Sequence, residues 1–183
     1  MSARRFFVVA SLLGLALGAI GGAALTLRIL RPSTSAPVDA EAVLLFAGGE
    51  GERAAGAVEI ATAQGIPTLI VSVGNGNWEG SEEFLALCDA EIDGLDVVCF
   101  SPEVDDTAGE AARMVEIAIE RGYTSLIAAT SDYHVSRAAL RVRQCFDGQV
   151  GQFPIEIGAT RNEFFHEFFG LIEALAIDRS CHD

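Results

Sequence analysis

The chain has 183 residues, of which 26 are acidic and 12 are basic, so its formal net charge is −14 at pH 7. Nucleic-acid phosphates would repel a chain this acidic, and a nucleic-acid-binding role is therefore disfavoured. Half of the residues are hydrophobic, which excludes a mainly disordered protein. We expect a folded protein without a nucleic-acid partner.

The first 31 residues differ sharply from the rest, because they contain no acid. No residue between Phe6 and Leu27 is charged, and a helix over this run would be about 33 Å long, enough to cross the hydrocarbon layer. Two arginines flank each end: Arg4, Arg5, Arg28 and Arg31. The alternative is a cleaved signal peptide, since small residues at 19–24 could form a peptidase site. The length favours a retained anchor over residues 1–31.

A short N-terminus before a single apolar helix usually leaves the following domain exported. We therefore expect a single-pass protein of the plasma membrane with an extracytoplasmic soluble domain. Residues 32–40 are expected to form a linker because they are polar and proline-bounded, and residues 179–183 a tail.

Residues 41–178 alternate between short apolar runs and helix-like stretches, which predicts one α/β domain. The apolar runs, expected as buried strands, are 42–47, 68–73, 96–100 and 125–130. The helix-like stretches are 53–64, 79–89, 107–121 and 134–146, and a strand near 153–157 and a helix over about 162–178 follow. Strand and helix in alternation predict right-handed crossovers, a mainly parallel sheet and a three-layer sandwich.

The four cysteines lack the spacing of a zinc ribbon or a thioredoxin motif. In an exported domain an even number of cysteines permits disulfides. Pairing of neighbours along the chain would join Cys88 to Cys99 and Cys145 to Cys181, and buried free thiols are the alternative.

Polar loops follow each of the four predicted strands. They are GGEGER (48–53), GNGN (74–77), SPEVDDT (101–107) and SDYHVSR (131–137). Ligands of open parallel sheets bind beyond the carboxyl ends of the strands, where such loops lead into helices. The four loops therefore predict a binding pocket at one edge of the sheet.

The first loop suggests an anion pocket. Gly48 and Gly49 would let the backbone approach a ligand closely, while Arg53 and the helix N-terminus would supply positive charge. The loop lacks the third glycine of a dinucleotide fingerprint and the GK[ST] of a Walker loop. A tight turn that needs glycine and nothing more is the alternative interpretation.

The segment TSDYHVSRA (130–138) carries the most chemistry. Ser131 or Asp132 could cap the next helix, with Tyr133 and His134 at the mouth of the strand. Arg137 would lie beside His134 one helical turn on, a pair suited to an oxyanion. His134 is the candidate acid or base, and a hydrogen-bonded histidine without chemistry is the alternative. A Ser131–Asp132–His134 triad is disfavoured, since triad residues normally come from distant chain positions.

Three further features complete the pattern. One of Asp105 and Asp106 is expected as the N-cap of the helix that starts at Thr107. With Glu103 these carboxylates could hold a divalent cation, but their spacing matches no calcium loop, and we expect no metal site. A stripe at helical spacing is expected in the core: Phe164, Phe168, Leu171 and Leu175. Trp78 could cover the pocket, touch lipid or lie on the surface.

In their order along the chain, FAGGEGER, IVSVG, DDTAGEA, TSDYHVSRA and HEFFGL resemble the YdcF-like family, domain of unknown function 218, which includes the SanA and ElyC envelope proteins. The resemblance spans about residues 42–175. It implies a Rossmann-like fold, often tethered by one N-terminal helix, and a role in the cell envelope, in peptidoglycan or lipid-carrier metabolism. The family's motif residues correspond to Gly48, Gly49, Arg53, Thr107, Tyr133, His134 and Arg137.

The combined prediction is a membrane-anchored envelope protein that binds a small phosphorylated, nucleotide-like or lipid-linked ligand. The expected ligand-binding residues are Gly48, Gly49, Arg53, Gly74, Asp106, Thr107, Ser131, Tyr133, His134 and Arg137. One alternative is a non-catalytic binding or scaffold module. Another is an S-adenosylmethionine-binding protein, in which Glu79 or Asp106 would hold the ribose.

Overall fold

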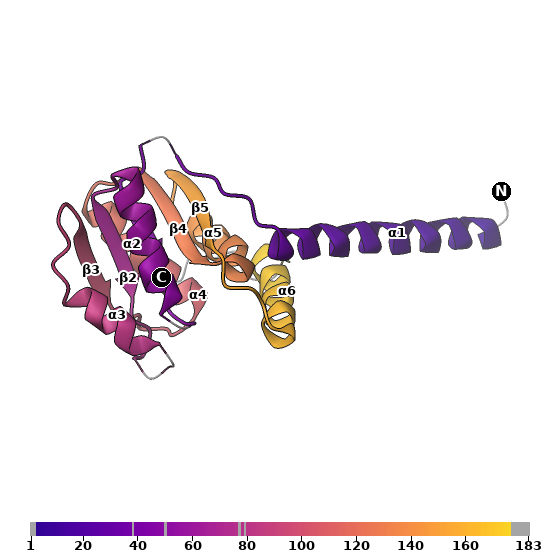
Figure 1. Ribbon diagram of the computed structural model, residues 1–183. Helices are drawn as coiled ribbons and strands as arrows, with labels where there is room; N and C mark the ends of the chain where they lie inside the picture. Colours follow the sequence, from indigo (N-terminus) through magenta and orange to yellow (C-terminus); the bar gives the residue numbers. More distant parts are fainter. Residues whose placement is uncertain (1–2, 38, 50, 77, 79, 177–183) are drawn as a thin grey trace.

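The computed structural model describes residues 3–37, 39–49, 51–76, 78 and 80–176. A long helix precedes an α/β domain with helices on both faces of one sheet (Figure 1). The strands are β1 (Ala42–Leu45), β2 (Thr68–Ser72), β3 (Asp96–Phe100), β4 (Ser125–Ser131) and β5 (Gln149–Ile155). The helices are α1 (Ala3–Leu30), α2 (Glu52–Gln64), α3 (Ser81–Cys88), α4 (Thr107–Glu120), α5 (Asp132–Cys145) and α6 (Arg161–Ala176).

The described strands form a five-stranded, all-parallel sheet in the order β3-β2-β1-β4-β5. The predicted α/β fold with a parallel sheet is therefore confirmed. The chain moves outward in one direction from β1 to β3 and then crosses back to β4, so β1 and β4 flank the point where the strand order reverses. In such sheets this reversal point is the usual position of a ligand.

The two sides of the sheet form two cores because successive strand residues point to opposite faces. Leu44 and Phe46 pack with α4 and α5, whereas Val43 and Leu45 pack with α2 and α3. All four residues of β1 are buried. Central strands covered on both faces need the near-continuous apolar runs that made them recognisable in the sequence.

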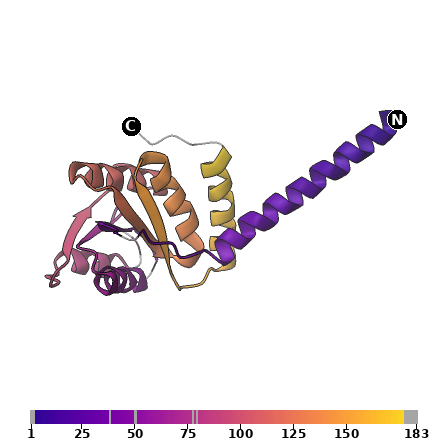
Figure 2. The same ribbon diagram turned by 90° about the horizontal axis from the view of Figure 1, so that it is seen from above.

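Helix α1 is long and apolar enough to cross a membrane from Phe7 to Leu30. It extends away from the domain, and only its last turns contact α5 and α6 (Figure 2). There Ile29 is buried in a third cluster with Tyr133 and Leu171, against which Phe164 and Phe168 also pack. The predicted apolar stripe of α6 thus packs in a core, which joins the domain to the base of α1 instead of covering the sheet.

At the β5 edge of the sheet, two details differ from expectation: where the strand begins and how the segment after α1 packs. Strand β5 begins at Gln149, four residues before the predicted start, because as an edge strand it carries polar residues such as Gln152 that weaken its apolar pattern. The segment after α1 packs along that edge, where Ser35 pairs antiparallel with Gln152. A side-chain bond from Gln152 Nε2 to the Ser33 carbonyl, 2.9 Å long, also fixes it.

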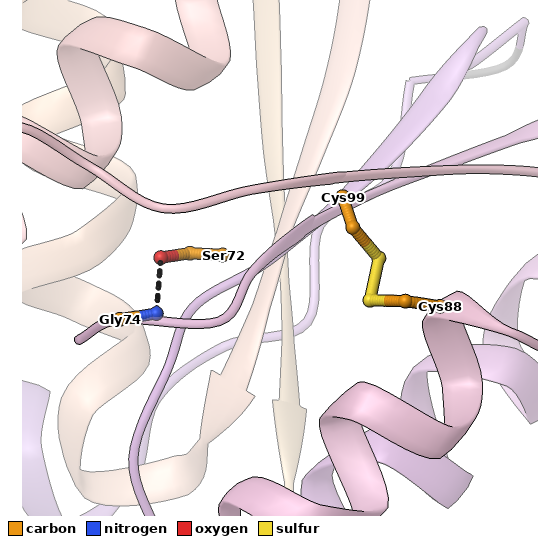
Figure 3. Close-up of a disulfide and its surroundings, with 4 residues drawn as sticks. All are labelled: Ser72, Gly74, Cys88 and Cys99. Atoms are coloured by element: carbon orange, nitrogen blue, oxygen red, sulfur yellow. Dashed lines mark hydrogen bonds between the residues drawn. A yellow bond between two sulfur atoms is a disulfide. The ribbon is translucent and has the colours of Figure 1, made fainter. Parts of the chain in front are cut away.

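A disulfide joins Cys88 at the end of α3 to Cys99 in β3 (Figure 3). This confirms the first predicted pairing. The second involves Cys181, which lies outside the described residues. The bond ties the helix to an edge strand that is only partly buried, and it closes a short loop, since the cysteines are 11 residues apart.

We expect the double substitution Cys88→Ala/Cys99→Ala to lower the free energy of unfolding by between about 2 and 3 kcal/mol, since the loop would no longer be restrained in the unfolded chain. Denaturant unfolding of the full chain in detergent measures this difference. An unchanged free energy of unfolding in this variant would contradict a structural role for the bond.

Candidate functional site

The candidate site lies where β1 and β4 end side by side. Residues from six elements meet there: the loop after β1, α2, the first turn of α4, the end of β4, the start of α5 and α6. Six of the predicted site residues take part in it through side-chain hydrogen bonds: Arg53, Thr107, Ser131, Tyr133, His134 and Arg137. They form two adjacent clusters, one around Arg53 and one around Arg137.

Arg53 is buried, with 5 % of its surface exposed. Its Nη1 donates to the Ala47 carbonyl over 2.8 Å, and its Nη2 donates to Ser131 Oγ at 2.8 Å and to Tyr133 Oη at 3.3 Å. Within the described part of the chain no carboxylate lies within 4.0 Å of it, and its Nε has no hydrogen-bond partner. Burial of such a cation is costly unless an anion compensates it.

The paired glycines of the first loop fold over this guanidinium. Gly48 and Gly49 have φ values of 97° and 76°, which residues other than glycine rarely adopt. A Cβ on Gly49 would stand 2.8 Å from Arg53 Nε, and one on Gly48 would stand 3.2 Å from Arg53 Nη1. The glycine pair therefore provides room for Arg53 and leaves the edge of its guanidinium covered by backbone alone.

We expect Gly49→Ala to lower the free energy of unfolding by about 2 kcal/mol, because it adds both backbone strain and a clash with Arg53. Gly65→Ala is the matched control. Gly65 also has a positive φ, 67°, but a Cβ there meets nothing within 4 Å, so only the strain of about 1 kcal/mol remains. Equal losses of stability for Gly49→Ala and Gly65→Ala in denaturant unfolding would show that the contact with Arg53 does not affect stability.

Glu110 is a member of the site that the sequence analysis did not select. Its Oε1 accepts a hydrogen bond from the Ala47 amide over 2.8 Å. Glu110 therefore binds the backbone amide of Ala47, while Arg53 binds its carbonyl. Desolvation raises the pKa of Glu110 to about 7, although hydrogen bonds from Ser72 and Ala47 and the charge of Arg53 oppose the rise. Near neutral pH this carboxyl can therefore give or take a proton.

The second cluster centres on Arg137. Its Nε and Nη2 donate to the two carboxylate oxygens of Glu167 over 2.8 and 2.7 Å, and its Nη1 donates to Thr107 Oγ1 over 2.8 Å. Gly170 of α6 permits this approach, since a Cβ there would stand 3.0 Å from Arg137 Nε. Arg137 is thus neutralised by a two-point ion pair, in contrast to Arg53.

His134 belongs to the cluster around Arg137. Its Nδ1 lies 3.0 Å from Glu167 Oε1 and 3.2 Å from Arg137 Nη2, and its ring meets Phe46 edge-on at 6.2 Å between centroids. Desolvation lowers the pKa of His134 to about 4, the charge of Arg137 adds to this, and Glu167 opposes it. The imidazole is therefore neutral at pH 7 and could accept a proton.

Glu167 remains ionised beside it. Burial alone would raise the pKa of Glu167, but the hydrogen bonds from Arg137 and His134 and the charge of Arg137 outweigh burial and lower it. His134 and Glu167 thus form a buried histidine–carboxylate pair in which the carboxylate orients the ring. The sequence analysis did not select Glu167, although it lies in the HEFFGL segment (166–171), and its place in that motif could have indicated a site residue.

Tyr133 connects the site to the base of α1. Its hydroxyl donates to Glu163 Oε1 over 2.8 Å and accepts from Arg53, while its ring packs in the cluster that contains Ile29. Desolvation raises the pKa of Tyr133, which keeps the hydroxyl protonated at neutral pH. One side chain therefore separates Arg53 from the apolar N-terminal helix.

The remaining predicted residues have local roles. Asp106 is the expected N-cap of α4, since its Oδ1 accepts from the Ala108 and Gly109 amides over 2.9 and 2.8 Å. Ser131 makes no capping hydrogen bond, because its hydroxyl accepts from Arg53 instead. Gly74, with a φ of 55°, makes room for Trp78, whose ring packs against Phe84 in the core. The Gly74 amide donates to Ser72 Oγ (Figure 3).

The arrangement offers one buried cation with unused donors, one carboxyl that titrates near neutral pH and one neutral imidazole. A guanidinium has five N–H donors, and the described contacts of Arg53 use three. No group of three histidine, cysteine, aspartate or glutamate side chains that could hold a metal occurs among the described residues. Glu79, the other residue considered for a ribose contact, lies outside them.

Comparison of the chain with protein-family models, with curated proteins and with solved structures found no match in any of the three.

Proposed function

We propose that the protein is a membrane-anchored envelope protein whose site at the ends of β1 and β4 binds a phosphorylated ligand. The observation that carries this proposal is the buried guanidinium of Arg53, which has no carboxylate within 4.0 Å among the described residues. A phosphate oxygen would supply the missing negative charge and accept from the free Nε–H.

The closeness of the site to α1 supports a lipid-linked ligand, such as a polyprenyl phosphate. Tyr133 contacts both Arg53 and the cluster around Ile29, near the end of the apolar helix. A site held this close to a membrane can receive a headgroup while the hydrocarbon tail stays in the bilayer. A freely diffusing nucleotide would need no such placement.

The disulfide between Cys88 and Cys99 supports an extracytoplasmic domain, since disulfides persist in oxidising compartments. The resemblance of the chain to the YdcF-like family points in the same direction, toward peptidoglycan or lipid-carrier metabolism. Helix α1 would then be retained as the anchor.

Binding of a polyprenyl phosphate to the full chain in nanodiscs tests the proposal, with the unphosphorylated polyprenol as the control ligand. We expect Arg53→Gln to weaken binding at least about tenfold, because a charge-assisted contact contributes roughly 1.5 to 3 kcal/mol. The matched control is Arg113→Gln, which removes an exposed arginine with a side-chain exposure of 43 %. Equal binding of phosphate and alcohol, or of the Arg53 and Arg113 variants, would contradict the proposal.

A second candidate function is a recognition module without catalysis. It is favoured by the mutual saturation of Arg137, Glu167 and His134, which bind one another and Thr107. In that case His134→Gln and Glu110→Gln would leave ligand binding intact, and no chemical change of the ligand would be detected. Turnover that is lost in either variant while binding survives would instead identify an enzyme.

A further inference from the structure

A basic cleft lies at the base of α1, between the end of that helix, α5 and β5. Its volume is about 480 Å³, and its walls come from the last turns of α1, the segment that follows, the outer face of α5 and β5. The residues that matter here are Leu27, Arg28, Arg31, Ser136, Leu140 and Arg143. None of them belongs to the candidate site described above.

Three arginines gather in this cleft although the chain as a whole has a net charge of −14. The described wall of the cleft contains no acidic residue, and none of the three arginines lies within 4.0 Å of a carboxylate in the described part of the chain. Burial and the like charge of Arg28 lower the pKa of Arg143. The cleft is thus a local excess of positive charge that an anion would relieve.

Hydrogen bonds hold the walls of the cleft in place. Ser136 Oγ donates to the Arg28 carbonyl over 2.9 Å, which fixes the end of α1 against α5. Arg143 donates from Nε and Nη2 to the Val150 carbonyl, over 3.3 and 2.9 Å, and so stays against β5. The bridge between Ser35 and Gln152 holds the opposite wall. The Arg143 guanidinium and the backbone of the walls are therefore held in place before any ligand binds, which lowers part of the entropic cost of binding.

The position of the cleft selects the kind of anion. The apolar span of α1 runs from Phe7 to Leu30, so Arg28 and Arg31 stand where the helix would leave the hydrocarbon layer. Lipid phosphates occupy that depth, and basic side chains there attract anionic lipids. Leu27 and Leu140 supply apolar surface beside the arginines, as a lipid with a charged headgroup and acyl chains requires.

We propose that this cleft binds the headgroup of an anionic glycerophospholipid, with the phosphodiester at Arg28, Arg31 and Arg143 and the acyl chains along α1. The bound lipid would fix the orientation of the domain on the membrane surface. This proposal does not depend on the ligand of the candidate site, since the two sites share no residue.

Native mass spectrometry of the full chain released from detergent tests the proposal, with phosphatidylglycerol as the anionic probe and phosphatidylcholine as the zwitterionic one. We expect one phosphatidylglycerol to bind at least about tenfold more tightly than phosphatidylcholine, because each basic group near the headgroup contributes to the attraction. The triple substitution Arg28→Gln/Arg31→Gln/Arg143→Gln should abolish this preference.

The control is Arg113→Gln/Arg121→Gln/Arg161→Gln, which removes the same charge elsewhere and should keep the preference. Arg28 and Arg31 are exposed, so Arg28→Gln/Arg31→Gln replaces the triple variant if that variant does not fold. Equal affinity for the two lipids, or an unchanged preference in the cleft variants, would overturn the proposal. So would competition by soluble glycerol 3-phosphate as strong as that of the lipid, because the site would then recognise a free phosphate. An unchanged preference in Arg53→Gln keeps this test separate from that of the proposed function.

Discussion

The substitution Arg137→Ala is expected to lower the free energy of unfolding by about 3 to 5 kcal/mol, because it leaves the carboxylate of Glu167 buried without its partner. The side chains of Arg137 and Glu167 are only 14 % and 5 % exposed, so water cannot replace the lost contacts. Thr107 would also lose its hydrogen bond. Denaturant unfolding of the full chain in detergent measures the loss.

Arg113→Ala is the matched control for this experiment. Arg113 also pairs with a glutamate, Glu116, at 2.9 Å, but both side chains are well exposed, at 43 % and 59 %. Exposed pairs contribute at most about 1 kcal/mol. If Arg137→Ala costs no more than Arg113→Ala, the cluster around Arg137 does not stabilise the fold as described.

The second prediction concerns opposite pH dependences of two buried groups. The pKa of His134 is about 4 in the folded protein, below its ordinary 6.5, so between these values only the unfolded chain holds the proton. The free energy of unfolding therefore rises with pH in this range. The pKa of Glu110 is about 7, above its ordinary 4.5, so between those values only the folded protein holds the proton, and the free energy of unfolding falls as pH rises.

The two effects offset each other between pH 4.5 and 6.5 in the unsubstituted protein. When one group is removed, the free energy of unfolding follows the titration of the other group, with a slope of about 1.4 kcal/mol per pH unit. We expect the stability of His134→Gln to fall with pH across this range and that of Glu110→Gln to rise. Between pH 4.5 and 6.5, the difference in the free energy of unfolding between the two variants should therefore change by about 5 kcal/mol in total.

Urea unfolding at several pH values gives these slopes, and each slope is compared within one variant, so a constant loss of stability does not affect it. The double variant should regain the shallow profile of the unsubstituted protein. Parallel profiles in the two single variants would contradict the assigned burial of His134 and Glu110.

The fold was predictable because its central strands are covered on both faces. That environment requires apolar runs such as residues 42–47 and 125–130, and the polar loops between the elements then mark the carboxyl edge of the sheet. Edge strand β5 was less accurately predicted, since a partly exposed strand keeps polar residues. The contact of α6 with α1 was not predicted, because an apolar stripe does not specify which surface covers it.

At the site, the sequence indicated which segments meet but not how their charges pair. Arg53 and Arg137 carry the same charge, and both lie near the start of a helix that follows a strand, in α2 and α5. Yet Arg137 is neutralised by Glu167, and Arg53 is not paired with a carboxylate among the described residues. That difference depends on α6, which follows the last strand of the sheet. Glu110 could have been found from its spacing, since it lies three residues after Thr107 on the first turn of α4, and both side chains bond into the site.

Hydrogen exchange of the full chain in nanodiscs, with and without a polyprenyl phosphate, tests the central claim most directly, namely that the ends of β1 and β4 form the ligand site. We predict slower amide exchange at residues 47–54 and 130–137 when the ligand is present, and no such change with the unphosphorylated polyprenol. Slower exchange confined to residues 24–35, at the base of α1, or no change in either segment, would contradict the claim.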